Sequence, residues 1–317
     1  MDRRSFVAGA SATALVGCVI PPEPDPAPRS FASPIVSIPF RIDYGRRLIV
    51  QGLVNNGGPR DFIVDTAATT SVLFENAMAP SEAERSGLPD INLLGLNGVQ
   101  RAPTFRIGSI DVGGRRLENH IAPILRDWEN FQRTPHGVLG LDFLGRTVMV
   151  IDPVTSRLEL YDAPTEEIEA LSQGWRSVPL QKEALGLPSP PFLLVDVVIR
   201  RKRTPFLVDT GSRSTLCNFP AVAHLQTIPQ ITAPNRNRAT VSDIYSDEIE
   251  AFILRKYAID LGVVRLPAQP ILVAETRFFD EIGFRDRPFG VLGLDNLLQQ
   301  PFAIDFSENR LFVRRTA

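Results

Sequence analysis

The chain has few of the residues that usually build disulfides, metal sites and nucleophiles. Its 317 residues include two cysteines, three histidines and two tryptophans. The cysteines, Cys18 and Cys217, form no CxxC pair, which leaves no zinc site of that type. Cys18 belongs to the leader described below, so no internal disulfide is expected in the mature chain. Without a disulfide, stability must come from packing. Cys217 lies in an apolar stretch and is expected to be a small buried residue.

Several catalytic patterns are missing as well. His120, His136 and His224 lie far apart in the chain and form no His-Glu-x-x-His pattern, so a zinc hydrolase is unsupported. No Gly-x-Ser-x-Gly elbow is present, which argues against a serine hydrolase. No phosphate-binding glycine loop is present either. The sequence thus gives no support for a metal or a cofactor.

The net charge of −2 gives no general reason to expect a nucleic acid partner. The one tight basic run is 200–203, Arg-Arg-Lys-Arg, between apolar segments; it is either a charged hairpin turn or a binding patch. With 44% hydrophobic and 22% charged residues, the chain is an ordinary globular sequence. It is long enough for two cores of roughly 140 residues each.

The amino terminus is not expected to belong to the fold. Arg3-Arg4 precede an apolar stretch, 6–16, that is too short to span a bilayer but suits a signal peptide. Arg-Arg-Ser-Phe-Val resembles a twin-arginine export signal, and Leu-Val-Gly-Cys resembles a lipoprotein box. This assigns 1–18 as a lipoprotein-type signal with Cys18 lipidated, and predicts a periplasmic or envelope location. The alternative is a soluble secreted form. The proline-rich residues 19–35 read as an extended linker.

One stretch of twelve residues occurs twice. Residues 62–73 read Phe-Ile-Val-Asp-Thr-Ala-Ala-Thr-Thr-Ser-Val-Leu, and 206–217 read Phe-Leu-Val-Asp-Thr-Gly-Ser-Arg-Ser-Thr-Leu-Cys. In each copy a short apolar strand runs into an acid, Asp65 or Asp209. A carboxylate in that place is costly to bury unless it is hydrogen-bonded or shares a proton. The repetition predicts that the two acids meet.

A second echo follows each copy. His-Gly-Val-Leu-Gly-Leu-Asp-Phe-Leu at 136–144 returns as Phe-Gly-Val-Leu-Gly-Leu-Asp-Asn-Leu at 289–297. The acids are 144 positions apart, whereas Gly140 and Gly293 are 153 apart, as are the segments starting at Asp152 and Asp305, which read as closing hairpins. A fixed offset interrupted by one insertion is typical of a duplicated domain. We assign the lobes to 36–174 and 175–317.

The pattern apolar-apolar-Asp-Thr-Gly, followed later by apolar-apolar-Gly, resembles the aspartic proteases. The matching pieces are 63–67 with 138–140, and 207–211 with 291–293. Each half is similar to a retropepsin unit, two units in one chain are similar to pepsin, and the Gly-Leu-Asp-Phe-Leu ending resembles bacterial periplasmic versions. The resemblance implies an all-β, bilobal pepsin/retropepsin-like fold, with two homologous half-barrel lobes and a few short helices.

The resemblance also implies roles for particular residues. Asp65 and Asp209 would be a catalytic dyad that shares one proton and activates water. Thr66 and Thr210 would hold the two acid loops together. The supporting glycines would give those loops room to pass, because they lack a Cβ; they are Gly140 and Gly293.

The two acid loops differ in their small residues. Ala67 stands where the family pattern and the second copy, at Gly211, have glycine; this leaves open an active but slower site or a degenerate lobe. Ser212 can offer a hydroxyl to Asp209, whereas Ala68 can offer none to Asp65. Since a hydrogen bond to the charged form lowers a pKa, we expect Asp209 to carry the charge more often.

Family members close their cleft with a hairpin flap. Gly95-Leu96-Asn97-Gly98 lies where a flap tip belongs, and its glycines Gly95 and Gly98 suit a mobile turn; a surface loop is the alternative. In the second half, 235–246 is a weaker candidate. Asp142 and Asp295 follow the glycine motifs, in an expected short helix, and are assigned structural roles.

A period of two predicts further strands, and apolar runs between turn signals predict others. Pro39 places its strand at a sheet edge. The expected strands are 36–42, 48–54, 61–64, 192–199 and 205–208, with a turn at 55–58. Short helices are expected at 81–86 and 164–173, the second near the lobe boundary.

Two function classes remain open. The first is an endopeptidase that cuts proteins or peptides at the envelope, with a lipid anchor as its contact with the membrane. The second is a binding or scaffold protein that has lost turnover, for which Ala67 is the best argument. One chain supplies both acids, so a monomer suffices, although a homodimer with dyads formed between chains stays open.

Overall fold

The computed structural model describes residues 33–79, 84–85, 87–128, 135–162, 174–185, 192–225, 238–242, 248–254 and 256–314. The predicted signal segment 1–18 with Cys18 lies outside these residues, as does all but the end of the linker 19–35. The helix predicted at 164–173 lies outside them too.

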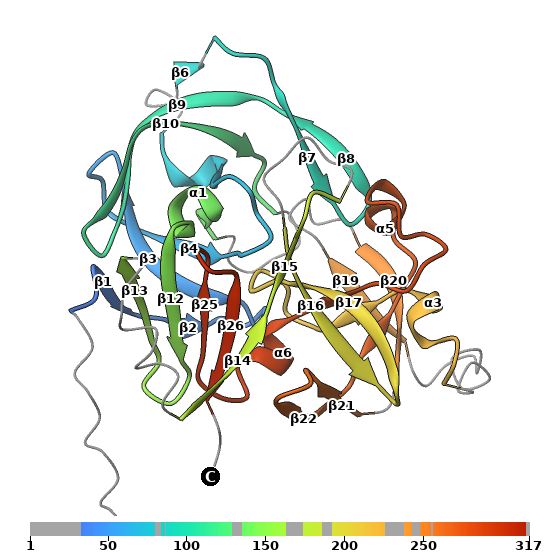
Figure 1. Cartoon of the computed structure of the whole chain (residues 1–317). Helices are drawn as coiled ribbons and strands as arrows, with labels where there is room; N and C mark the ends of the chain where they lie inside the picture. Colours follow the sequence, from blue (N-terminus) through green and yellow to red (C-terminus); the bar gives the residue numbers. More distant parts are fainter. Residues whose placement is uncertain are drawn as a thin grey trace, which may run out of the picture. The chain divides into compact units, whose positions relative to one another are not determined.

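A six-stranded sheet joins the two halves of the chain, and each half contributes three strands (Figure 1). Its order is β1 (Val36–Pro39), β13 (Arg157–Asp162), β12 (Thr147–Asp152), β25 (Phe302–Asp305), β26 (Arg310–Arg314) and β14 (Trp175–Pro179). Both predicted closing hairpins, β12–β13 and β25–β26, are confirmed. β1 is an edge strand, as its proline predicts.

The centre of this sheet has a local twofold axis. In the β12–β25 pair, Val150 lies opposite Ala303. Ala303 is also the residue 153 positions after Val150, the offset that relates the two hairpins. A residue that pairs with its own duplicate lies on the symmetry axis. The 153-residue offset read from the sequence therefore corresponds to a pseudo-twofold pairing in the sheet.

The first half forms an eight-stranded sheet that closes on itself. Its strands are β2 (Arg41–Ile42), β3 (Leu48–Val54), β4 (Pro59–Val64), β11 (Gly137–Leu139), β5 (Val72–Phe74), β10 (Arg115–Leu125), β9 (Thr104–Val112) and β6 (Glu84–Arg85). β9 is long enough to pair with β10 along its length and with the end of β3 at Ile110 and Asp111. That second pairing turns the predicted half-barrel into a closed ring.

The second half repeats the plan as an open, half-barrel sheet in the part of the chain that the structure describes. Its order is β19 (Arg238–Ser242), β20 (Glu248–Ile253), β23 (Leu272–Val273), β18 (Leu216–Cys217), β24 (Gly290–Leu292), β17 (Lys202–Val208), β16 (Phe192–Ile199), β21 (Tyr257–Asp260) and β22 (Arg265–Gln269), with β15 (Gln181–Glu183) on β16.

The remaining elements are short. β7 (Ile91–Gly95) and β8 (Gly98–Ala102) form a two-stranded hairpin of their own. The helices are η1 (Glu75–Ala77), α1 (Leu141–Leu144), α3 (Phe219–Val222), α5 (Arg277–Glu281) and α6 (Leu294–Leu297). Among the described residues, no helix is long and apolar enough to cross a membrane. The predicted all-β class with a few short helices is confirmed.

The largest apolar core spans both halves. One cluster of buried side chains contains Ile151 of β12 and Ile304 of β25, both with 0% exposure, together with residues of each barrel-like sheet. Cys217 belongs to the same cluster, so the prediction of a small buried residue is confirmed, and burial raises the pKa of its thiol. The halves therefore share one hydrophobic interior.

Most of the local predictions are confirmed. The strands 48–54 and 192–199 have the predicted bounds, and Arg200 and Arg201 form the turn of a β16–β17 hairpin at positive φ. The strand predicted at 36–42 is interrupted at Phe40. The helix predicted at 81–86 is wrong where it is described, because Glu84–Arg85 pair with the edge of β9. A tertiary partner overrides weak local helix propensity there.

The shared core predicts that the two halves unfold together. Ile151→Ala and Ile304→Ala should each cost about 2–5 kcal/mol of stability, because each leaves a cavity in a fully buried place. Single-tryptophan variants that retain Trp128 or Trp175 report on the two halves during denaturation. Both probes should show one coincident transition that moves equally in either alanine variant. Val154→Ala, at an exposed turn, is the control; separate transitions would contradict a shared core.

Candidate active site

Both predicted acids stand at the end of a central strand. Asp65 follows β4 and Asp209 follows β17. β4 runs parallel to β11, and β17 runs parallel to β24, so each acid lies beside its glycine motif. The backbone N–H of Asp65 donates to the carbonyl of Leu139 at 3.0 Å, and that of Asp209 donates to Leu292 at 3.1 Å. The strand pairing therefore fixes where each acid loop begins.

Thr66 and Thr210 tie the two acid loops together. The N–H of Thr66 donates to Oγ1 of Thr210 at 3.2 Å, and the N–H of Thr210 donates to Oγ1 of Thr66 at 3.1 Å. Each hydroxyl donates in turn to the opposite strand, to Val208 and to Val64, both at 2.8 Å. Both threonines have 0% exposure. Four hydrogen bonds without competing water thus hold the loops in one arrangement.

The two carboxyl groups lie in contact between these loops. Oδ1 of Asp65 accepts from the N–H groups of Ala67 and Ala68 at 2.8 and 3.0 Å. Oδ1 of Asp209 accepts from Gly211 and Ser212 at the same distances. The side chains are also within hydrogen-bonding range of each other. Asp65 and Asp209, which are 144 positions apart in the sequence, therefore belong to one site.

Burial raises the pKa of both acids. It raises the pKa of Asp65 above its ordinary range, although backbone N–H groups and the partner act to lower it. Burial and the negative charge of Asp65 raise the pKa of Asp209 well above the ordinary range. Both residues still keep part of their surface exposed. The pair can hold one proton between two carboxyls while remaining accessible to water.

The glycines of the second motif are needed for close approach. A Cβ on Gly140 would lie 2.7 Å from the carbonyl oxygen of Ala68, and one on Gly293 would lie 2.7 Å from that of Ser214. Leu141 and Leu294 then bond the same loops through their N–H groups, at 2.8 and 2.9 Å. The steric role expected for both glycines matches this geometry.

Two hydroxyl–carboxylate pairs behind the loops were missed by the sequence reasoning. Ser71 Oγ donates to Asp142 Oδ1 at 2.6 Å and accepts from the N–H of Gly140. Thr215 Oγ1 donates to Asp295 Oδ1 at 2.7 Å and accepts from Gly293. Ser71 and Thr215 each come six residues after an acid of the dyad, and this repeated spacing was a usable signal. The structural role predicted for Asp142 and Asp295 agrees with these contacts.

These two supporting acids have opposite pKa shifts. Burial acts to raise the pKa of Asp142, but hydrogen bonds from His120 and Ser71 outweigh it and hold the pKa low. Nε2 of His120 lies 3.2 Å from Oδ2 of Asp142. For Asp295, burial outweighs the hydrogen bonds from Thr215 and Asn296 and raises the pKa. The surroundings thus favour the ionised form of Asp142 and disfavour the ionised form of Asp295.

The predicted role of Ser212 is wrong. Its hydroxyl donates to the backbone carbonyl of Ser214 at 2.9 Å, so it does not serve Asp209. The backbone donors to the two acids are matched. No side-chain hydrogen bond from Ser212 therefore favours the charged form of Asp209, because that hydroxyl donates to the carbonyl of Ser214 instead.

The predicted flap tip is the turn of the β7–β8 hairpin, with Gly95 opposite Gly98. The hairpin reaches α5 of the other half (Figure 1). The carbonyl of Leu96 accepts from the N–H of Phe278 at 3.1 Å, and Gly98 faces the side chain of Arg277. In the second half, the described part of 235–246 belongs to β19, which pairs with β20 within the large sheet.

Apolar contacts also cross from the first half to the second near the dyad. Ala67, Leu94 and Leu96 pack against a cluster whose buried members include Leu207 and Val291. The methyl group of Ala67 thus faces the second half rather than its own barrel, and Gly211 lies against the carboxyl group of Asp65.

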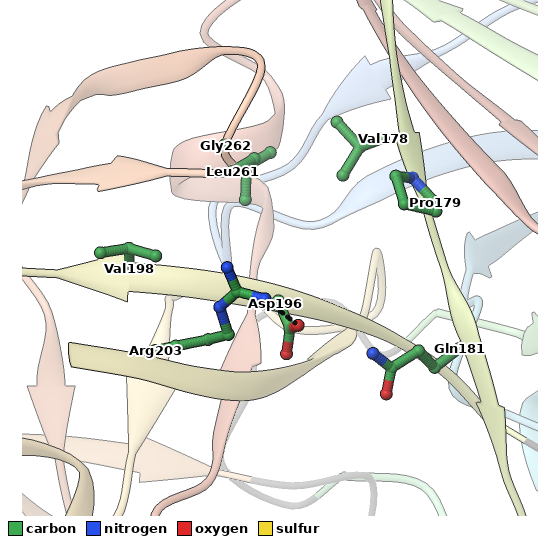
Figure 2. Close-up of a pocket in the computed structure, with 8 residues that line it drawn as sticks. All are labelled: Val178, Pro179, Gln181, Asp196, Val198, Arg203, Leu261 and Gly262. Carbon is green, nitrogen blue, oxygen red and sulfur yellow. Dashed lines mark hydrogen bonds and ion pairs between the residues drawn. The ribbon is translucent and has the colours of Figure 1, made fainter. Parts of the chain in front are cut away.

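A pocket of about 170 Å³ lies elsewhere, and no dyad-loop residue lines it. Figure 2 shows its walls, where Arg203 lies 3.3 Å from Asp196. The lining residues are Val178, Pro179, Gln181, Asp196, Val198, Arg203, Leu261 and Gly262. In the described residues, no three His, Cys, Asp or Glu side chains are grouped to hold a metal ion.

Comparison with protein-family models matches residues 50–143 to the family described as aspartyl protease. The matched segment contains the Asp65 loop, the β7–β8 hairpin and Gly140. Comparison with curated proteins finds no match. The mostly β structure, with one closed and one half-barrel sheet, has the bilobal aspartic-protease fold.

The raised pKa values of Asp65 and Asp209 predict that the dyad lowers the stability of the fold as pH rises. Because folding favours the protonated form, stability is greatest below the ordinary carboxyl pKa and falls as pH rises through the folded value. Asp209→Asn should therefore unfold at a higher temperature than the parent at pH 7, with the difference shrinking toward pH 4.

Asp142→Asn is the control of opposite sign. The pKa of Asp142 is lowered, so this acid stabilises the fold above its ordinary pKa, and that contribution disappears as pH falls. Asp142→Asn should destabilise at pH 7 and approach the parent in acid. Parallel pH curves for all three proteins would contradict the assignment.

Proposed function

We propose that this chain is an aspartic endopeptidase that hydrolyses peptide bonds of envelope or periplasmic proteins. The observation that carries the proposal is the contact between Asp65 and Asp209 on loops locked by Thr66 and Thr210. Two partly exposed carboxyls that share one proton supply a base and an acid at one place. The family match over 50–143 supports the same chemistry.

The reaction needs only these two acids and water. The ionised carboxyl takes a proton from water as the water oxygen attacks the peptide carbonyl carbon. The protonated carboxyl donates to the carbonyl oxygen. In the breakdown step, the nitrogen of the leaving amine is protonated as the C–N bond breaks. The loops supply the fixed geometry, because their N–H groups hold one oxygen of each acid in place.

The location and partners in this proposal come from the sequence. Arg3-Arg4 and the segment ending at Cys18 support export and lipid anchoring, which would present the enzyme to envelope proteins. Both acids come from one chain, which supports a monomer as the active unit; a homodimer remains the alternative.

A catalytically weak or inactive peptide-binding or scaffold protein is the second candidate. Ala67 favours it, since a methyl group stands on one loop where the duplicate has glycine. The hydrogen bond between the hairpin and α5 favours it as well, because a hairpin held by that bond opens less readily for a substrate.

Asparagine variants of the dyad test the first proposal. Asp65→Asn and Asp209→Asn should each lower cleavage of a denatured protein at pH 4 to 7 by at least about 100-fold, because each removes the acid–base function. Asp196→Asn, in the separate pocket, should cleave like the parent. Absence of cleavage by the folded parent would favour the scaffold candidate. Activity restored by mixing the two dyad variants would contradict the monomer.

The β7–β8 hairpin is the proposed flap, and α5 is its latch. Phe278→Pro removes the N–H that bonds Leu96, and proline is tolerated in a first helical turn. Phe278→Ala removes the ring but keeps the N–H. Because a net hydrogen bond contributes about 0.5–1.5 kcal/mol, amides of β7 and β8 should exchange about 2- to 10-fold faster in Phe278→Pro than in Phe278→Ala. Equal exchange in the two variants would show that the bond does not hold the hairpin.

A further inference from the structure

The threonine bonds and the backbone donors of the two acid loops obey the local twofold symmetry. The reciprocal threonine bonds and the pairs of N–H donors to Asp65 and Asp209 agree within 0.1 Å. The loops differ in their small residues, since Ala67 and Ala68 stand where the second loop has Gly211 and Ser212. The hydroxyl of Ser212 donates to the carbonyl of Ser214 and not to an acid, which leaves the residue after the threonine as the difference beside the carboxyls. Any inequivalence of the two acids can be sought at this position.

Gly211 leaves no room for a side chain. A Cβ built on it would lie 2.3 Å from Oδ2 and 2.4 Å from Cγ of Asp65. Real Cβ atoms essentially never approach other heavy atoms below 3.0 Å. The carboxyl of Asp65 therefore occupies the space directly beside the backbone of Gly211.

On the first loop, the matching space is filled. Ala67 carries a methyl group there, so the Asp209 carboxyl cannot lie as close to residue 67 as the Asp65 carboxyl lies to Gly211. Asp65 has the bare backbone of Gly211 beside it. By the local symmetry, Asp209 has the methyl group of Ala67 on the matching side, and that methyl group packs against the apolar cluster of the second half.

We propose that Ala67 is a positioning residue that divides the roles within the dyad, with Asp209 as the proton donor and Asp65 as the base. The inference rests on the proposed peptidase function. A methyl group beside Asp209 excludes water from that side and disfavours its charged form. This division of roles is the reverse of the one expected from the Ser212 hydroxyl. Its proposed cause is the methyl group of Ala67.

The step balances with one shared proton. A bond forms between the water oxygen and the carbonyl carbon, the water proton passes to Asp65, and the carbonyl oxygen takes the proton of Asp209. In breakdown, Asp65 gives its proton to the nitrogen, the C–N bond breaks, and a diol hydroxyl returns a proton to Asp209. The dyad regains its starting state, so no other reactant is required.

Other charges near the loops do not account for the inequivalence. Among the described residues, the charge that acts on Asp209 is that of Asp65. Asp142 and Asp295 lie behind the loops, bonded to Ser71 and Thr215. Arg213 is on the second loop but exposed to solvent.

Ala67→Gly tests the proposal through the pH profile of kcat/KM. Restored access of water to Asp209 should move the alkaline limb to lower pH, on the order of one pH unit, the usual scale of carboxyl pKa changes. The acidic limb, set by Asp65, should move less. Ala68→Gly introduces the same flexibility one residue away, where the methyl packs on the first half, and should leave the alkaline limb in place. An unmoved alkaline limb in Ala67→Gly overturns the proposal.

A second measurement does not depend on catalysis. In an Asp65→Asn background, Asp209 titrates alone, and its raised pKa makes the unfolding temperature fall as pH rises from 4 to 7. Adding Ala67→Gly should make that fall shallower. Identical slopes with and without Ala67→Gly overturn the positioning role. A parent that cleaves nothing overturns the peptidase function instead, while this slope still decides the role of Ala67.

Discussion

The reciprocal hydrogen bonds between Thr66 and Thr210 are the constraint on which the site depends. Each hydroxyl accepts from the opposite backbone and donates to the opposite strand, with no exposure to solvent. Losing either hydroxyl would leave buried backbone groups without partners, which is costly. Asp65 and Asp209 directly precede these threonines in the chain, so the contact between the carboxyls is held by the threonine bonds and by the strands that end at each acid.

Around this symmetric centre, the two halves differ in ways that matter for function. In the first half, His120 contacts Asp142 and the main sheet closes into a barrel. Its β7–β8 hairpin is a separate two-stranded sheet that is hydrogen-bonded to α5. In the second half, Asp295 is bonded to Thr215 and Asn296, and β19 and β20 belong to the main sheet. The pseudo-twofold arrangement provides a framework for two acids, and these departures from symmetry give each acid its own surroundings.

The sequence predicted best where backbone requirements are local. Apolar runs between turn residues located β3 and β16, and the positive φ of Arg200 and Arg201 suits the charged turn. It failed where a distant partner decided the outcome. Glu84–Arg85 pair with β9 instead of forming a helix, and the hydroxyl of Ser212 bonds a neighbouring carbonyl that competes better than Asp209.

The sequence by itself determined the two acid loops, their glycine partners and the duplicated order, because a strand ending in Asp-Thr and a glycine without a Cβ are local chemical requirements. Only the tertiary structure decided that Ser71 and Thr215 hold the supporting acids, that Leu96 bonds Phe278, and that Ala67 faces the second half. These contacts join residues far apart in the chain or depend on side-chain direction. Packing in the folded chain selects these contact partners, and the spacing of residues along the chain does not specify the direction in which each side chain points.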